Sequence, residues 1–194
     1  NINRIRNHFP NSFHYLFEPN ETIINDIQKI YKPYKSKLYN FALSNNNGEG
    51  YLKLNEAGST LHNYSDFVGV KNQKFHNRKV KLHKLDDLHI PENKKYFMKI
   101  DSEGHELNIL KGARKTLEHV NYILLETRLV PCYDNSYSIE DIFKEMTLNN
   151  FRFGLVASIG DPYKKIYRYL DILWVKKDLY DDFLLKILEK QKKM

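Results

Sequence analysis

The sequence of 194 residues contains a single cysteine, no long hydrophobic run and no glycine-rich GxGxxG pattern. One cysteine excludes a disulfide within the chain, and we expect Cys132 to be a buried, inert thiol in a cytoplasmic protein. No apolar run approaches the roughly 20 residues that a membrane-spanning helix needs. Residues 1–10 also lack the apolar segment of a signal peptide. These absences favour a reducing compartment and argue against a membrane span.

Basic residues exceed acidic ones, at 31 against 24, which gives a net charge of +7. The lysines are spread along the chain and acids lie between them, so we interpret the excess as a solvated basic surface. No pattern typical of DNA or RNA recognition stands out, and we expect no nucleic-acid partner.

Apolar segments alternate with segments of helical periodicity. Helices are expected from Asn20 to Tyr31, after Asp101, from Ser138, and from Asp178 to Gln191, whereas residues 55–76 are expected to form a polar loop. This alternation predicts one α/β domain with a mostly parallel sheet covered on both faces. The expected strands are residues 13–17, 37–43, 51–54, 79–85, 96–100, 122–125, 151–157 and 169–175.

Acidic residues follow three of the expected strands. Glu18 follows residues 13–17, Asp101 follows residues 96–100, and Glu126 follows residues 122–125. Ligands of open α/β sheets bind beyond the carboxyl ends of the strands. Glu18 suits the two hydroxyls of a ribose, although an acid at a helix N-terminus is an equally good interpretation.

The densest group of acids lies in residues 101–106, which read DSEGHE. Glu106 is expected to be structural at a helix N-terminus, with Gly104 forming a tight turn. Asp101 needs a partner if it is desolvated, and Lys99 is a candidate. Binding of a hard divalent cation by Asp101, Glu103, His105 and Glu126 is an alternative, but the spacing fits no dedicated metal motif, so no metal is expected.

Several short motifs, in order along the chain, resemble those of the FkbM-type methyltransferases. The resemblance covers about residues 8–176. The most specific motif is Lys99–Glu106 followed by residues 110–113, which read LKGA. The others are Phe9-Pro10, Leu16–Asn20 (LFEPN), Ala42–Ser44 with Gly48, Ser59–Leu61, Leu85–Asp87 (LDD), and Glu126 after YILL.

This resemblance implies an S-adenosylmethionine-dependent enzyme on a Rossmann-like sheet with an antiparallel strand near the C-terminus. The implied reaction is O-methylation of a hydroxyl on a sugar, glycan or secondary metabolite. In cofactor binding, Glu18 would contact the ribose, Phe41 and Ala42 would lie by the adenine, and Asp101 would lie near the transferred methyl. Catalytic residues on the acceptor side would be Asp101, Glu103, His105 and Glu126. For the role of general base, His62, His76 and His83 are competing candidates.

The family's first strand and its glycine-rich turn have no counterpart in residues 1–8. The resemblance places that strand between residues 13–17 and 96–100, so we expect an N-terminally truncated domain with residues 178–194 as an extra helix. The alternative is a non-catalytic remnant of the fold that acts as a binding or scaffold protein. A nicotinamide-dependent oxidoreductase ranks last because no GxGxxG pattern occurs.

Substrate choice is expected to lie in the loops at residues 55–76 and 128–138. Tyr133, Tyr137 and Tyr163 could stack on a sugar ring or simply pack. The sequence names neither the acceptor nor the oligomeric state.

Overall fold

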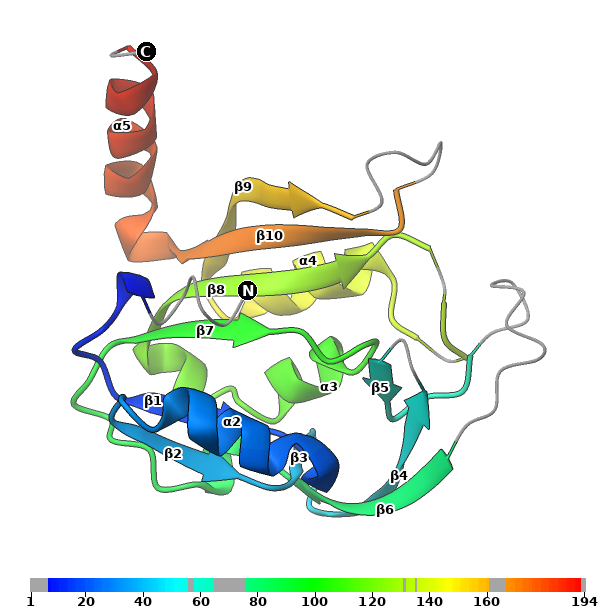
Figure 1. Cartoon of the computed structure of the whole chain (residues 1–194). Coiled ribbons are helices and arrows are strands. Elements are labelled where there is room, and N and C mark those ends of the chain that lie inside the picture. The colour runs from blue at the N-terminus through cyan, green and yellow to red at the C-terminus, as the bar shows by residue number, and fades with distance from the viewer. Residues whose placement is uncertain are drawn as a thin grey trace.

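The computed structural model describes residues 7–55, 58–64, 76–130, 132–134, 136–160 and 167–192, and it arranges their strands in three sheets (Figure 1). One four-stranded sheet has the strand order β7-β8-β10-β9. A second sheet has the order β3-β6-β4-β5, and β1 pairs with β2 in a third. The strands are β1 (His14–Phe17), β2 (Ser36–Tyr39), β3 (Ala42–Leu43), β4 (Gly48–Asn55), β5 (Gly58–Thr60), β6 (His76–His83), β7 (Tyr96–Ile100), β8 (Val120–Arg128), β9 (Phe151–Ile159) and β10 (Tyr169–Lys176).

Strand directions are mixed. β10 runs antiparallel to both β8 and β9, which confirms the antiparallel strand expected near the C-terminus. The expectation of a mostly parallel sheet is not met, because only β1-β2, β3-β6 and β7-β8 are parallel among the strand pairs of the described residues. The antiparallel pairs are those of β4 with β5 and β6, and of β10 with β8 and β9. The segment 37–43 was also expected to be one strand. It divides after Tyr39, and Ala42 and Leu43 join a different sheet.

β1 and β7 face each other through side chains. Among the described residues, β1 has strand hydrogen bonds to β2 and β7 has them to β8, with none between β1 and β7. The Phe9 and Phe97 rings stack at 5.6 Å between centroids, and the Tyr15 and Tyr96 rings meet edge-on at 6.4 Å. This is the position at which the sequence analysis expects a further strand.

Two helix starts were predicted correctly. The Asn20 side chain accepts the Thr22 N–H at 3.1 Å ahead of a 3₁₀ turn (Glu21–Ile23) and α2 (Ile24–Tyr31). Ser138, where a helix was expected to begin, forms a capping box with Asp141 at the start of α4 (Ile139–Leu148).

The other two helices differ from expectation. α3 (Glu106–Lys111) is short and ends at Gly112, and a 3₁₀ turn (Thr116–His119) follows. α5 (Tyr180–Gln191), preceded by a 3₁₀ turn (Lys177–Leu179), projects away from the sheets (Figure 1). Its Phe183 and Ile187 are half-buried, whereas Leu184 and Leu188 are exposed.

The main core lies between the β7-β8-β10-β9 sheet and helices α3 and α4. This core stabilises the sheet, because burying each large aliphatic or aromatic side chain contributes about 1.5–3 kcal/mol to the stability of the fold. The fully buried members of this core include Leu110, Leu117, Ile123, Leu125, Ile142, Met146, Ile172 and Trp174.

None of the described helices is long and apolar enough to cross a membrane.

Candidate active site

The loop after β7 makes a sharp reversal that depends on one glycine. Glu103 has φ of 52° and Gly104 has φ of 99°, so two successive residues adopt left-handed backbone. A Cβ on Gly104 would lie 2.4 Å from Cδ2 of Tyr133, closer than any real contact. The tight turn predicted at Gly104 is therefore confirmed, and Tyr133 packs directly on it.

Glu106 holds this loop from inside. It is 1% exposed, and its carboxylate accepts the backbone N–H of Ser102 at 2.8 Å and that of Gly104 at 3.1 Å. The Tyr137 hydroxyl donates to its Oε2 at 2.5 Å. A buried carboxylate with three donors is a fully satisfied structural group. The structural role predicted for Glu106 is confirmed.

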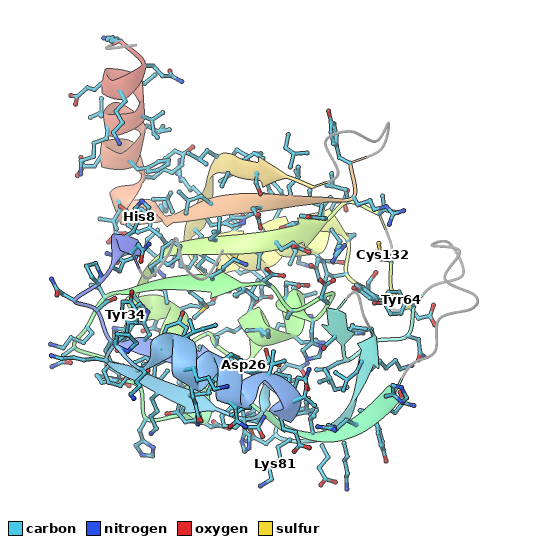
Figure 2. The ribbon with its side chains drawn as sticks, in the orientation of Figure 1. His8, Asp26, Tyr34, Tyr64, Lys81 and Cys132 are labelled. Carbon is cyan, nitrogen blue, oxygen red and sulfur yellow. The ribbon has the colours of Figure 1, made fainter. Side chains whose placement is uncertain are left out.

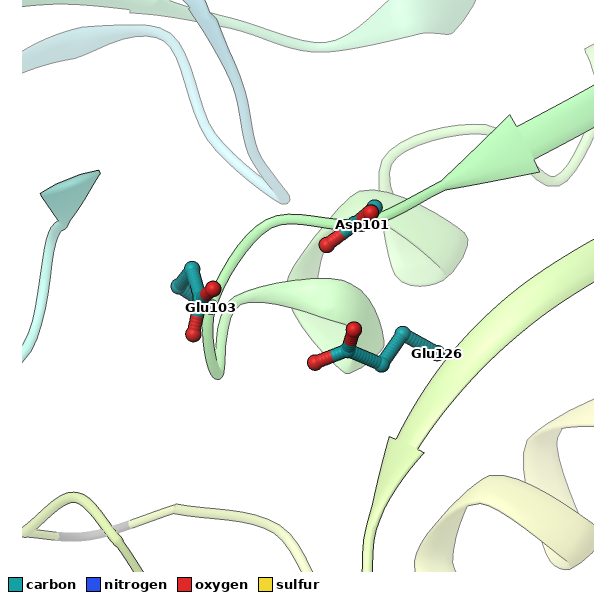
Figure 3. A group of neighbouring side chains, drawn as sticks. All are labelled: Asp101, Glu103 and Glu126. Carbon is teal, nitrogen blue, oxygen red and sulfur yellow. The ribbon is translucent and has the colours of Figure 1, made fainter. Parts of the chain in front are cut away.

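Three other acids gather beside the loop. One carboxylate oxygen each from Asp101, Glu103 and Glu126 lies within 4.8 Å of the other two (Figure 3). Asp101 and Glu103 come from the loop after β7, and Glu126 comes from the neighbouring strand β8. Glu126 does not end its strand as expected, because β8 continues to Arg128. The sequence analysis thus grouped these acids correctly, whereas His105 lies outside the group.

Cations contact each of the three acids. The Nζ of Lys99 donates to Oδ2 of Asp101, which confirms the predicted pair. Arg128 Nη2 donates to Oε2 of Glu103, and the Tyr133 hydroxyl donates to the same oxygen at 2.7 Å. Sequence reasoning missed Arg128. The signal was strand alternation, because residues 126 and 128 of one strand share a face.

Glu126 is the least satisfied member of the group. It is 8% exposed, and its Oε1 accepts no hydrogen bond within the described part of the chain. The Nη2 of Arg128 lies 2.9 Å away but outside hydrogen-bonding geometry. Burial first, and then the charge of Asp101, raise the pKa of Glu126 to about 8, although Arg128 opposes the shift. The carboxyl ends of these strands thus concentrate negative charge that the protein only partly neutralises.

His105 belongs to a separate chain of hydrogen bonds. Its Nε2 lies 3.0 Å from the Ser44 hydroxyl, and its Nδ1 lies 3.0 Å from Nε2 of His62. Burial, assisted by His62, lowers the pKa of His105 to about 4. Burial also lowers the pKa of His62. His105 is therefore a neutral, buried residue that connects the loop after β7 to β3 and β5.

Comparison with known proteins identifies the chain's family. The profile of the methyltransferase FkbM domain matches residues 4–153. The chain belongs to the FkbM methyltransferase domain family. No curated protein matches the sequence. The crystal structure of methyltransferase FkbM from Methylobacillus flagellatus has a similar fold, with a TM-score of 0.57 and 17% identity. The match covers 90% of this chain and 40% of that one, so this chain spans less than half of the solved protein.

Other motifs of the FkbM family hold the loop that carries Asp101 and Glu103 in place. A Cβ on Gly112 would meet the Ser44 carbonyl oxygen at 1.9 Å, so the end of α3 can lie against β3 only with glycine there. The Asp86 carboxylate accepts the N–H groups of Lys115 and Thr116 at 3.0 and 2.8 Å. Thr60 donates to the Glu103 carbonyl at 2.7 Å. These contacts fix the acid-bearing loop from several sides.

The predicted cofactor residues of this FkbM domain lie around the end of β1. Glu18 is half-buried, its Oε1 accepts the Asn20 N–H at 2.7 Å, and burial raises its pKa. Its Oε2 accepts no hydrogen bond from a described residue, which suits a ligand hydroxyl. Phe41 follows β2, with its ring 6.0 Å from that of Phe17, and Ala42 is buried.

The strands that carry both groups point the same way. The arrows of β2, β7 and β8 run toward one side in Figure 1, and β1 is parallel to β2. Glu18 and the group of Asp101 and Glu126 therefore stand at the same edge of the domain, as predicted for a ligand site.

The remaining predicted residues have varied positions. Tyr133 and Tyr137 pack and hydrogen-bond inside the loop region, whereas Tyr163 and residues 65–75 lie outside the described residues. Cys132 is buried, as predicted, in the segment after β8, on the same side of the molecule as Tyr64 (Figure 2). His83 packs against Phe41 at 4.4 Å between ring centroids, and His76 is exposed at the start of β6.

Proposed function

We propose that this FkbM domain is part of an S-adenosylmethionine-dependent methyltransferase on a Rossmann-like sheet, which methylates a hydroxyl of a sugar, glycan or other small metabolite. The observation that carries the proposal is the single edge at which Glu18 follows β1, Asp101 follows β7 and Glu126 lies near the end of β8. The matched family region contains all three residues. A nucleoside-binding acid and an acceptor-side group of acids are then adjacent parts of one site.

On the cofactor side, Glu18 acts as an orienting group. Its carboxylate is held by the Asn20 amide through one oxygen, which leaves the other to accept ribose hydroxyls. Phe41 and Ala42 border the adenine. S-adenosylmethionine, when bound, supplies an electrophilic methyl group on a sulfonium. Because methyl transfer is a direct displacement, fixing donor and acceptor in line contributes most of the rate.

On the acceptor side, Asp101 is the most accessible of the three acids. Asp101 is exposed, while Glu126 is buried and Glu103 is anchored by Arg128 and Tyr133. We assign orientation of the acceptor hydroxyl and acceptance of its proton to the Asp101 carboxylate. Glu103 and Glu126 shape the negative potential around it.

His105 supports this arrangement without being the base. Both of its ring nitrogens are hydrogen-bonded, and it is 8% exposed. A buried imidazole with a lowered pKa is a weak proton acceptor at neutral pH. His105 therefore positions the loop after β7 against Ser44 and His62.

A non-catalytic remnant of the fold is the second candidate. It is favoured by one observation, the lack of strand pairing between β1 and β7 among the described residues. Such a protein would keep the core and lose methyl transfer.

The deciding experiment measures transfer of a tritiated methyl group by the full-length gene product to candidate sugars and glycans. We expect transfer by the wild type and by the surface variant Glu92→Gln, and a loss of about tenfold or more in Glu18→Ala and Asp101→Asn. Unchanged transfer in both site variants would overturn the residue assignments. Absence of transfer and of cofactor binding in the wild type would favour the remnant.

A further inference from the structure

Glu126 is a buried carboxylate that points into a group of acids, and Arg128 Nη2, 2.9 Å from its Oε1, lies outside hydrogen-bonding geometry. Figure 3 shows its side chain extending from β8 toward Asp101 and Glu103. It is 8% exposed, and no described group donates a hydrogen bond to its Oε1. A buried carboxylate oxygen without a donor costs free energy unless something else satisfies it. The direction of the side chain places such a partner among the three acids, beside Arg128.

The local charges make this partner a cation. Asp101, Glu103 and Glu106 all act on Glu126 as like charges, and Arg128 is the one cation that opposes them. Lys99 is already engaged with Asp101 at the exposed side. With every acid ionised, four carboxylates face two cations, which leaves an excess of two negative charges. A divalent cation carries the charge that balances this excess.

We propose that Asp101, Glu103 and Glu126 form a binding site for a hard divalent cation of the calcium, manganese or magnesium type. Carboxylate oxygens are the ligands that such cations take in proteins. No metal was expected from the sequence, because the spacing of these residues fits no dedicated metal motif. Folding brings the three together and leaves His105 out, which yields a ligand set of oxygens only.

The spread of the oxygens favours a larger ion. An ion bound at about 2.3–2.6 Å, as calcium is, separates opposite ligands by about 4.6–5.2 Å. The three carboxylate oxygens lie within 4.8 Å of one another, which is close to the separation that calcium ligands have. Magnesium, at about 2.0–2.1 Å, requires the group to contract. Three protein ligands leave further coordination positions open to water or to oxygens of an acceptor.

A cation at this site would also contribute to the proposed methyl transfer. Resting on the proposed function, the cation would coordinate the acceptor hydroxyl beside Asp101, and a coordinated hydroxyl loses its proton more readily. Cation binding itself does not depend on methyl transfer, so the two proposals can fail separately.

Terbium luminescence tests cation binding directly. Terbium substitutes for calcium at oxygen sites and is excited through nearby tyrosines, and the Tyr133 hydroxyl lies 2.7 Å from a carboxylate oxygen of Glu103. We expect saturable luminescence from the 194-residue protein, displaced by calcium more effectively than by magnesium. No saturable luminescence, or luminescence that calcium cannot displace, would overturn the proposal.

Variants locate the site. Glu126→Gln and Asp101→Asn are expected to weaken terbium binding by about tenfold or more, and Glu92→Gln by less than about twofold. Arg128→Gln is expected to tighten binding by about threefold or more, because it removes a competing cation. Thermal unfolding without metal checks that each variant folds, and Asp101→Asn, at an exposed position, carries the test if Glu126→Gln does not. Equal binding by wild type and folded site variants would contradict the assignment.

Discussion

Glu106 and Glu126 are both buried glutamates, yet their surroundings are opposite. Glu106 accepts two backbone amides and a tyrosine hydroxyl, and it ties the loop after β7 to the start of α3. Glu126 faces two other acids, has an oxygen without a donor, and has a raised pKa. The difference separates two tasks within one acidic segment. Carboxylates that the protein satisfies hold the fold, and those that it leaves unsatisfied are available to a ligand.

The largest expected effect comes from removing the satisfied acid. Glu106→Ala leaves the amides of Ser102 and Gly104 and the hydroxyl of Tyr137 without an acceptor. At about 1–3 kcal/mol for each orphaned donor, we expect a loss of about 4 kcal/mol in the free energy of unfolding, measured by urea denaturation. Glu92→Ala, on the surface, should change it by less than about 0.5 kcal/mol. A loss below about 1 kcal/mol in Glu106→Ala would contradict the structural role.

Gly104→Ala tests the sharp turn at Glu103 and Gly104 in the loop after β7. The new methyl would collide with the Tyr133 ring and strain a left-handed backbone, so we expect a loss of about 2–4 kcal/mol by the same method. Gly50→Ala is the matched control, because its nearest Cβ contact is a Leu82 side-chain carbon at 3.3 Å. Similar costs for both variants would show that the turn is not special.

A smaller, pH-dependent effect should come from His105. Its pKa is about 4 in the folded protein and about 6.5 when unfolded, so only the unfolded chain binds a proton between these values. Stability should therefore be unaffected by this group above pH 6.5 and fall by up to about 3 kcal/mol as the pH drops toward 4. The facing groups are His62, Ser44 and Asn108, with Glu106 acting on His62.

Urea denaturation at a series of pH values checks this expectation. His105→Gln should flatten the dependence between pH 6.5 and 4, and His62→Gln should flatten it less. The same slope in wild type and His105→Gln would assign the titration to another group.

The smallest effect, of opposite sign, is expected at Glu126. Without metal at neutral pH, the raised pKa means that burying Glu126 costs free energy, so Glu126→Gln removes this cost and should raise the free energy of unfolding by about 1 kcal/mol. Glu106→Gln under the same conditions should lower it. If both changes destabilise the protein equally, the contrast between the two acids fails.

The sequence predicted those features that depend on neighbouring residues. The bounds of β7, the caps at Asn20 and Ser138, the turn at Gly104 and the role of Glu106 all arise within a few residues of chain. Local hydrogen-bonding and backbone rules act at that range, so the pattern was sufficient.

Features set by distant partners were missed or only partly predicted. β8 continues past Glu126 because β10 pairs with it as far as Arg128, and strand pairing is not visible in one segment. Residues 37–43 divide between two sheets for the same reason. His105 is drawn away from the acids by Ser44 and His62, which lie far from it in sequence. Grouping of the three acids followed from the expected fold, but the position of Arg128 between two of them did not.

Calorimetric titration of S-adenosylhomocysteine into the full-length gene product tests most directly whether the unsatisfied strand-end acids serve a ligand. The account predicts saturable binding by the wild type, affinity at least about tenfold weaker in Glu18→Ala, and unchanged affinity in Asp26→Asn, an exposed acid on α2. Equal affinities in wild type and Glu18→Ala, or no binding by either, would contradict it.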